Sequence, residues 1–161
     1  MNMKKHSNRR AALVLLLLLG TSPVFAAADT HAEWEQLNNQ SVELLNTGHY
    51  ADGVIVAKQA LALIEKNSDA DHPDVATSLN NLAELYRAQG QYAQAEPLYK
   101  RSLAILEKAL GENHPDVATS LNNLAELYRA QGQYAQAEPL YKRSLAIGEK
   151  VLGGNHPEVA T

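Results

Sequence analysis

The chain has 161 residues, no cysteine and a formal net charge of −4. Its length favours a single domain, and the missing cysteines exclude disulfides, thiol nucleophiles, cysteine zinc sites and a lipid-modified N-terminal cysteine. A hydrophobic content of 45% is ordinary for a globular protein and argues against disorder.

Residues 1–28 have the layout of a secretory signal peptide. Four basic side chains open the segment, and an unbroken apolar run follows over residues 11–19. Small residues then offer cleavage sites after Ala26 or Ala28. The alternative, an uncleaved membrane anchor, is disfavoured because the run is far shorter than the ~20 residues that span a bilayer. We therefore expect a bacterial protein that is periplasmic or secreted, with no membrane contact after cleavage.

Removal of this segment changes the charge of the chain. All four of its charged side chains are basic, so 10 Lys and Arg remain against 18 Asp and Glu, a net charge of about −8. A protein that binds nucleic acid or an anionic membrane is expected to carry a basic patch. Neither is therefore an expected partner.

An internal repeat of 42 residues dominates the rest of the chain. The segment from His72 to Ile105 recurs letter for letter from His114 to Ile147, and only three positions of the full period differ. An older, more divergent copy precedes them in the same register. We expect one domain over residues 29–161, with repeats at about 34–71, 76–113 and 118–155 and the start of a fourth at 156–161.

The first half of each repeat predicts an amphipathic helix. Leu79, Leu82, Ala83 and Tyr86 fall at i, i+3, i+4 and i+7, which places one apolar stripe along a helix. Gly90 follows at the position where a helix commonly ends with a positive φ. One repeat cannot bury the apolar stripe of such a helix by itself, but stacked copies of the repeat can.

The second half of each repeat predicts another helix with the same spacing. We expect it to begin near Ala93, which would place Pro97 in the first turn, where a missing N–H is tolerated. Asp71 or Asn113 can cap the helix that follows, with a proline in its first turn.

The order of these residues resembles the tetratricopeptide repeat, and the 42-residue period with its NNLAELY, GQYAQAEPLY and GENHP segments resembles the kinesin light chain type. The resemblance covers about residues 34–161. It implies an all-α fold, a right-handed α-solenoid of stacked helix-turn-helix units. It also implies a protein that binds other proteins or peptides.

The first repeat departs from this pattern. Gln40, Gly53 and Ala57 stand where the later repeats have Leu, Ala and Tyr, and Trp34 stands where they have Ala76 and Ala118. Terminal repeats are commonly atypical because one of their faces meets water. We interpret this repeat as an N-terminal cap and Trp34 as its packing anchor.

The residues that could carry chemistry do not form a catalytic set. His72, His114 and His156 recur every 42 residues, but equivalent positions of a stacked array cannot converge on one metal ion. Their interpretation as ordering residues at helix starts is favoured. The sequence contains no phosphate loop, no GxSxG and no HExxH motif. We expect no enzymatic activity, no metal and no other cofactor.

A polar row lies on the first helix of each repeat, opposite its apolar stripe. The resemblance implies that these helices line the concave face and that the second Asn of each pair points into the groove. Two interpretations stay open and are compatible: the Asn amides pair with an extended peptide, or they bond the neighbouring repeat and hold the stack together. The candidate groove residues are Asn38, Asn39, Asn80, Asn81, Glu84, Arg87, Asn122, Asn123, Glu126 and Arg129.

The sequence thus predicts a non-enzymatic interaction module whose protein or peptide partner is not identified by any motif. The alternative is a structural spacer or assembly scaffold within a longer repeat protein. Because the sequence stops just inside a fourth repeat, Leu140, Leu145, Ile147 and Val151 are expected under little cover, and Gly148 interrupts a helix. We therefore expect that the chain is a fragment of a longer array, or that its third repeat frays or self-associates.

Overall fold

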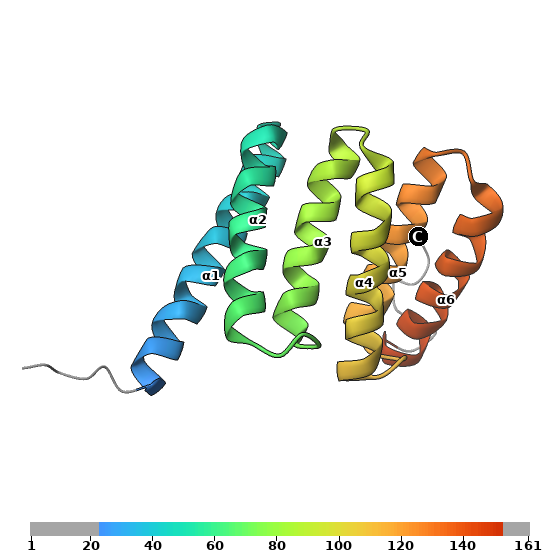
Figure 1. Ribbon diagram of the computed structural model, residues 1–161. Coiled ribbons are helices and arrows are strands. Elements are labelled where there is room, and N and C mark those ends of the chain that lie inside the picture. Colours follow the sequence, from blue (N-terminus) through green and yellow to red (C-terminus); the bar gives the residue numbers. More distant parts are fainter. Residues whose placement is uncertain (1–22, 153–161) are drawn as a thin grey trace, which may run out of the picture.

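The computed structural model describes the backbone of residues 23–152 and the side chains of residues 29–150 (Figure 1). Within that part the chain forms six helices and no strand, which confirms the all-α prediction. The helices are α1 (Pro23–Asn46), α2 (Tyr50–Asn67), α3 (Pro73–Ala88), α4 (Tyr92–Leu110), α5 (Pro115–Ala130) and α6 (Tyr134–Leu152). Residues 1–22 of the predicted signal peptide and the start of a fourth repeat at 156–161 lie outside the described residues.

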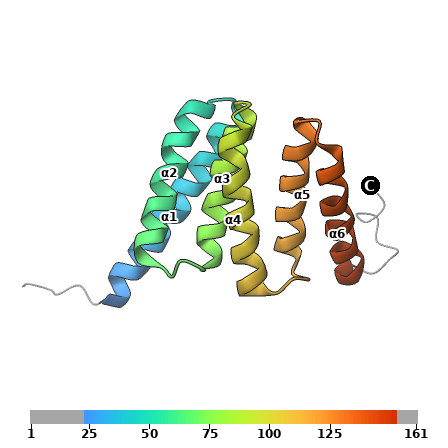
Figure 2. The same ribbon diagram turned by 45° about the vertical axis from the view of Figure 1, so that its right-hand side comes forward.

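The helices stack in order as three antiparallel pairs (Figures 1 and 2). In each pair the first helix packs along the second, and the second then packs against the first helix of the next pair. The backbones of α1 and α3 also approach each other, as do those of α3 and α5, whereas those of α2 and α4 do not approach within the described chain. The stack is therefore more compact on the side of the first helices, which makes that side the inner face.

The turns between paired helices use glycine as expected. Gly48, Gly90 and Gly132 have φ values of +79°, +72° and +73°, a region that L side chains rarely adopt. The prediction for Gly90 is thus confirmed.

The helix starts differ in two details from the prediction. Asp71 and Asn113 are not the caps: His72 and His114 are, because α3 and α5 begin directly at the prolines that follow them. Each imidazole Nδ1 accepts a hydrogen bond from the backbone N–H two residues on, at 3.2 Å, as an Asn or Asp side chain would at this position.

Pro97 is also deeper in its helix than predicted. Because α4 begins at Tyr92, Pro97 lies beyond the first turn, and α6 repeats this with Pro139. Each proline removes one interior backbone hydrogen bond. Both side chains are exposed, so water can reach the carbonyl that loses its partner.

The core runs without interruption through the stack. Leu79 and Leu121 are fully buried at equivalent positions, and Tyr99 is fully buried between helices of the second repeat. Trp34 is only 6% exposed and packs in the same cluster, as expected for an anchor. Gly53 serves a close approach of α2 to α3, since a Cβ there would lie 2.5 Å from Leu85 Cδ2.

The apolar side chains of the third repeat that were predicted to lie under little cover are not all exposed. Leu145 is 46% exposed, in agreement with the expectation, but Ile147 is 3% exposed, which corrects it. Ile147 belongs to the core cluster that joins all three repeats, together with Val117 and Leu121 of α5. The side chain of Val151 lies outside the described residues.

Candidate peptide-binding face

Asparagine amides link the first helices of successive repeats. The Asn81 amide on α3 donates to Asn38 Oδ1 on α1 at 3.2 Å, and the Asn123 amide on α5 donates to Asn80 Oδ1 on α3 at the same distance. Both bonds join positions 43 residues apart. The second Asn of one repeat therefore bonds the first Asn of the repeat before it, so the row is a ladder that runs along the stack.

The ladder leaves the asparagines unequally accessible. Asn38 is 6% exposed, and its amide also lies 3.4 Å from Ser78 Oγ, so it does not reach the surface of the inner face. Asn80, Asn81 and Asn123 are half-buried, while Asn39 and Asn122 are exposed. A side-chain amide offers two N–H donors and two acceptor lone pairs, so the half-buried members keep capacity for a further partner.

The charged members of the row are paired with each other. Arg87 donates from Nε to Glu84 Oε2 at 3.0 Å and forms a second bond from Nη2 to the other carboxylate oxygen. In the third repeat, Arg129 Nε lies 3.0 Å from Glu126 Oε2 and Nη2 lies 2.6 Å from it. These side chains thus present a neutralised pair to a partner, and not separate charges.

Each glutamate also accepts a hydrogen bond from a tyrosine of the following helix. Tyr99 Oη donates to Glu84, and Tyr141 Oη donates to Glu126, so each bond ties the two helices of one repeat together. Spacing along the chain does not indicate this contact, because the two residues are 15 positions apart on different helices. The 42-residue recurrence of both residues was the one available signal.

These contacts shift the acid–base properties of the carboxylates. Burial acts to raise the pKa of Glu84, but the hydrogen bonds from Arg87 and Tyr99 outweigh it and hold that pKa below its ordinary value. The hydrogen bonds from Arg129 and Tyr141 lower the pKa of Glu126 in the same way. Burial, followed by the Glu84 charge, raises the pKa of Tyr99, so this hydroxyl stays a donor.

A second ladder runs along the outer side of the stack. Arg101 on α4 bonds Glu65 on α2 at 2.6 Å, and Arg143 on α6 bonds Glu107 on α4. Sequence reasoning did not identify these pairs, which lie 36 residues apart. Because their side chains are partly exposed to solvent, each pair contributes little to stability on its own, at most about 1 kcal/mol.

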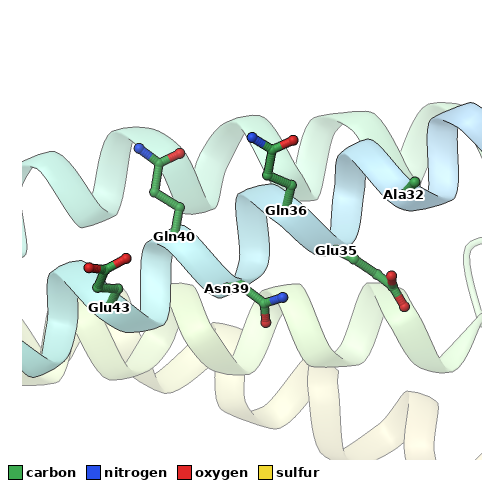
Figure 3. Close-up of a pocket in the computed structure, with 6 residues that line it drawn as sticks. All are labelled: Ala32, Glu35, Gln36, Asn39, Gln40 and Glu43. Atoms are coloured by element: carbon green, nitrogen blue, oxygen red, sulfur yellow. The ribbon is translucent and has the colours of Figure 1, made fainter.

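The first repeat has a shallow, polar pocket of about 670 Å³ on α1. Figure 3 shows Gln36 and Gln40 on one side of the helix and Asn39 and Glu35 on the other. Gln36 and Gln40 stand where later repeats have Ser78 and Leu82, which are buried against the preceding repeat. The polar side chains agree with the interpretation of this repeat as a cap.

Two properties of the described residues bear on other functions. No group of three His, Asp or Glu residues in that part is arranged to hold a metal ion. None of the described helices combines the length and apolar character needed to cross a membrane.

The chain matches known proteins along most of its length. The model of the tetratricopeptide repeat family matches residues 37–108, 80–150 and 116–161. Among solved structures, a provisionally named kinesin light chain of Podosopora anserina with nearly identical TPR-like repeats superposes with a TM-score of 0.71 at 30% identity. That match covers 78% of this chain and 59% of the other. This chain therefore spans less than two thirds of that protein's crystallised length.

Two further structures share the fold at lower identity. The TPR domain of Arabidopsis FLU has a TM-score of 0.66 at 18% identity, over 75% of this chain and 98% of that domain. BtubC (BKLC) from P. vanneervenii has a TM-score of 0.68 at 23% identity, over 86% of this chain and 53% of the other. With the repeat, the helix pairs and the family match in agreement, the chain belongs to the tetratricopeptide repeat family.

Proposed function

We propose that the chain is a non-enzymatic interaction module that binds a peptide or partner protein on its inner face. The observation that carries this is the row of asparagine amides along α1, α3 and α5, on the side where the first helices approach one another. An extended peptide exposes N–H and C=O groups at regular intervals, and a row of amides with spare donors and acceptors can pair with them.

The exposed asparagines are the best direct contacts. Asn39 and Asn122 lie at the two ends of the row, and neither makes a ladder bond in the described structure. Asn81 and Asn123 have a double role, because one N–H of each is used by the ladder. Asn38 acts only as support. The short row supports a modest affinity, on the order of micromolar.

The experiment separates binding from folding. Peptides are selected from a phage-displayed library on the immobilised protein, and their affinities are measured by fluorescence polarisation. The double variant Asn39→Ala, Asn122→Ala should bind the selected peptide about 5- to 10-fold more weakly while its thermal unfolding is unchanged. Unchanged affinity in this variant would place the binding surface elsewhere.

A matched control uses amides on the opposite layer. Gln94 and Gln136 are exposed at equivalent positions of α4 and α6. Replacing both with Ala should leave peptide affinity unchanged. A loss equal to that of the asparagine variant would show that the inner face is not the site.

We also propose export of this module from the cytoplasm. The basic start, the apolar run and the small residues at Ala26 and Ala28 support cleavage of residues 1–28. Cleavage at either site would leave Trp34 and the rest of α1 in the mature chain. N-terminal sequencing of protein from a bacterial periplasmic fraction tests this, and an intact Met1 would contradict it.

A further inference from the structure

A pocket of about 170 Å³ lies where α3, α4 and α5 meet, at the junction of the second and third repeats. Its walls include Ala76, Leu106 and Ser120, and Asp116 lies at its edge with a side chain that is 62% exposed. The volume is comparable to that of engineered cavities that bind a benzene ring.

One repeat earlier, the equivalent space is filled by an indole ring. Trp34 is 42 residues before Ala76, and Ala60 and Ile64, which share its core cluster, correspond to Ser102 and Leu106 of the pocket. The protein itself therefore shows which group fits this space, and the change from Trp to Ala opens it.

The hydroxyl at the inner end of the pocket, that of Ser120, also has a counterpart at the first junction, the hydroxyl of Ser78. At the first junction Trp34 Nε1 donates to Ser78 Oγ at 2.7 Å. The equivalent Ser120 is 2% exposed, and its Oγ has no hydrogen-bond partner among the described residues. A buried hydroxyl of this kind is stabilised by a ligand N–H that reaches it.

The edge of the pocket favours a cation. At the first junction His31 stacks on Trp34 with ring centroids 5.0 Å apart, and its Nδ1 lies 3.5 Å from Asp74 Oδ2. Asp116 is the counterpart of Asp74, and Pro73 takes the place of His31. No Lys or Arg is paired with Asp116 in the described structure. The capping His114 Nδ1, 3.5 Å from the carboxylate, accepts the Asp116 backbone N–H and so does not act as its cation.

We propose that this pocket binds an indole that carries a cationic amine, such as tryptamine. The ring occupies the space equivalent to that of Trp34, its N–H donates to Ser120 Oγ, and the ammonium group lies against the Asp116 carboxylate. This site goes beyond the proposed peptide binding and does not depend on it, because a small molecule can be tested directly.

The test measures 5-fluorotryptamine by ¹⁹F NMR and tryptamine by calorimetry, each titrated into the protein. We expect saturable binding with a Kd on the order of 1 mM, as suits a small ligand in a partly open pocket. Ala76→Trp should abolish it by filling the pocket. Ser120→Ala and Asp116→Asn, which change few atoms, should each weaken it at least about 5-fold.

The controls separate the pocket from general attraction to an acidic protein. Asp74→Asn alters the same helix position at the junction that Trp34 fills, so it should leave the affinity unchanged. 1-Methyltryptamine, which lacks the ring N–H, should bind wild type as weakly as tryptamine binds Ser120→Ala. The proposal is overturned by no saturable binding up to about 10 mM, or by equal losses in Asp74→Asn and Asp116→Asn.

Discussion

Each junction of the stack joins the first helix of one repeat to the repeat before it. The first helices α3 and α5 have the same sequence, whereas the preceding repeats differ. At the junction of repeats one and two, α3 meets Trp34 and Asn38. At the junction of repeats two and three, α5, whose sequence is identical to that of α3, meets Ala76 and Asn80. Ser78 consequently has hydrogen-bond partners, whereas Ser120 has none in the described chain. An identical repeat sequence therefore does not produce an identical environment, because the preceding repeat supplies half of each interface.

A tyrosine shared by α3 and α5 shows the same dependence on the preceding repeat, but here it is the second junction that has the additional hydrogen bond. Tyr128 donates to Glu96 Oε1 at 2.9 Å across the second junction, whereas its counterpart Tyr86 faces a repeat that has Val54 in the place of Glu96. Both tyrosine rings keep a lysine above them, Lys58 at 5.8 Å and Lys100 at 6.0 Å from the ring centroid. The first junction is thus distinguished by the buried ring of Trp34, and the second by the hydrogen bond from Tyr128 to Glu96.

The largest expected effect on stability comes from removing the indole ring of Trp34. Trp34→Ala should lower the free energy of unfolding by about 3–5 kcal/mol, because it leaves a cavity at the first junction and removes the hydrogen bond from Trp34 to Ser78. Urea denaturation followed by circular dichroism measures it. A loss below about 1 kcal/mol would mean that the two junctions do not differ as described.

The asparagine ladder should be the feature that the junctions share. Asn81→Ala and Asn123→Ala each remove one inter-repeat bond of 3.2 Å, so each should cost about 1–2 kcal/mol, and the two costs should be similar. The same denaturation experiment compares them. A large cost at one junction alone would show that the ladder is not a repeated support.

The Glu84 contacts should appear as a pH dependence. Because the folded pKa of Glu84 is lowered, its stabilisation is complete above the ordinary value of 4.5 and is lost as pH falls through the lower folded pKa. The thermal unfolding temperature of the wild-type protein should therefore fall below about pH 4.5. Glu84→Gln should flatten part of that slope, and an unchanged slope would contradict the assignment.

The smallest expected effect lies at the end of the stack. Gly148 stands inside α6 at the position where α4 has the buried Leu106, and a Cβ there would contact nothing within 4 Å. Gly148→Ala should therefore stabilise the third repeat by about 1 kcal/mol through helix propensity alone. Hydrogen exchange of α6 amides would detect it, and faster exchange in the variant would be the contrary result.

The sequence was sufficient for the features that depend on periodicity. The 42-residue repeat and the i, i+3, i+4 stripe predicted paired helices and their stacking, and Gly90 marked the turn. Helix starts were missed by a residue because His72 caps a helix as Asp71 could have done. For such positions the local sequence offers two acceptors, and only packing decides between them.

The candidate site was predictable as a row but not as a set of contacts. The family resemblance implied that Asn81 lies on the concave face and left open whether it binds a partner or the neighbouring repeat. The structure shows the bond to Asn38. The link from Glu84 to Tyr99 and the bond from Trp34 to Ser78 escaped prediction. Each depends on the distance between helices, which the periodicity of one helix does not contain.

The most direct test of the comparison makes the same substitution at both junctions. Ser78→Ala should lower the free energy of unfolding by about 1–3 kcal/mol, because the buried Trp34 N–H loses its acceptor. Ser120→Ala removes a buried hydroxyl that has no partner in the described chain, so it should be neutral within about 0.5 kcal/mol or stabilising. Equal losses from the two substitutions would contradict the account, because they would show that the preceding repeat does not set the environment of these two serines.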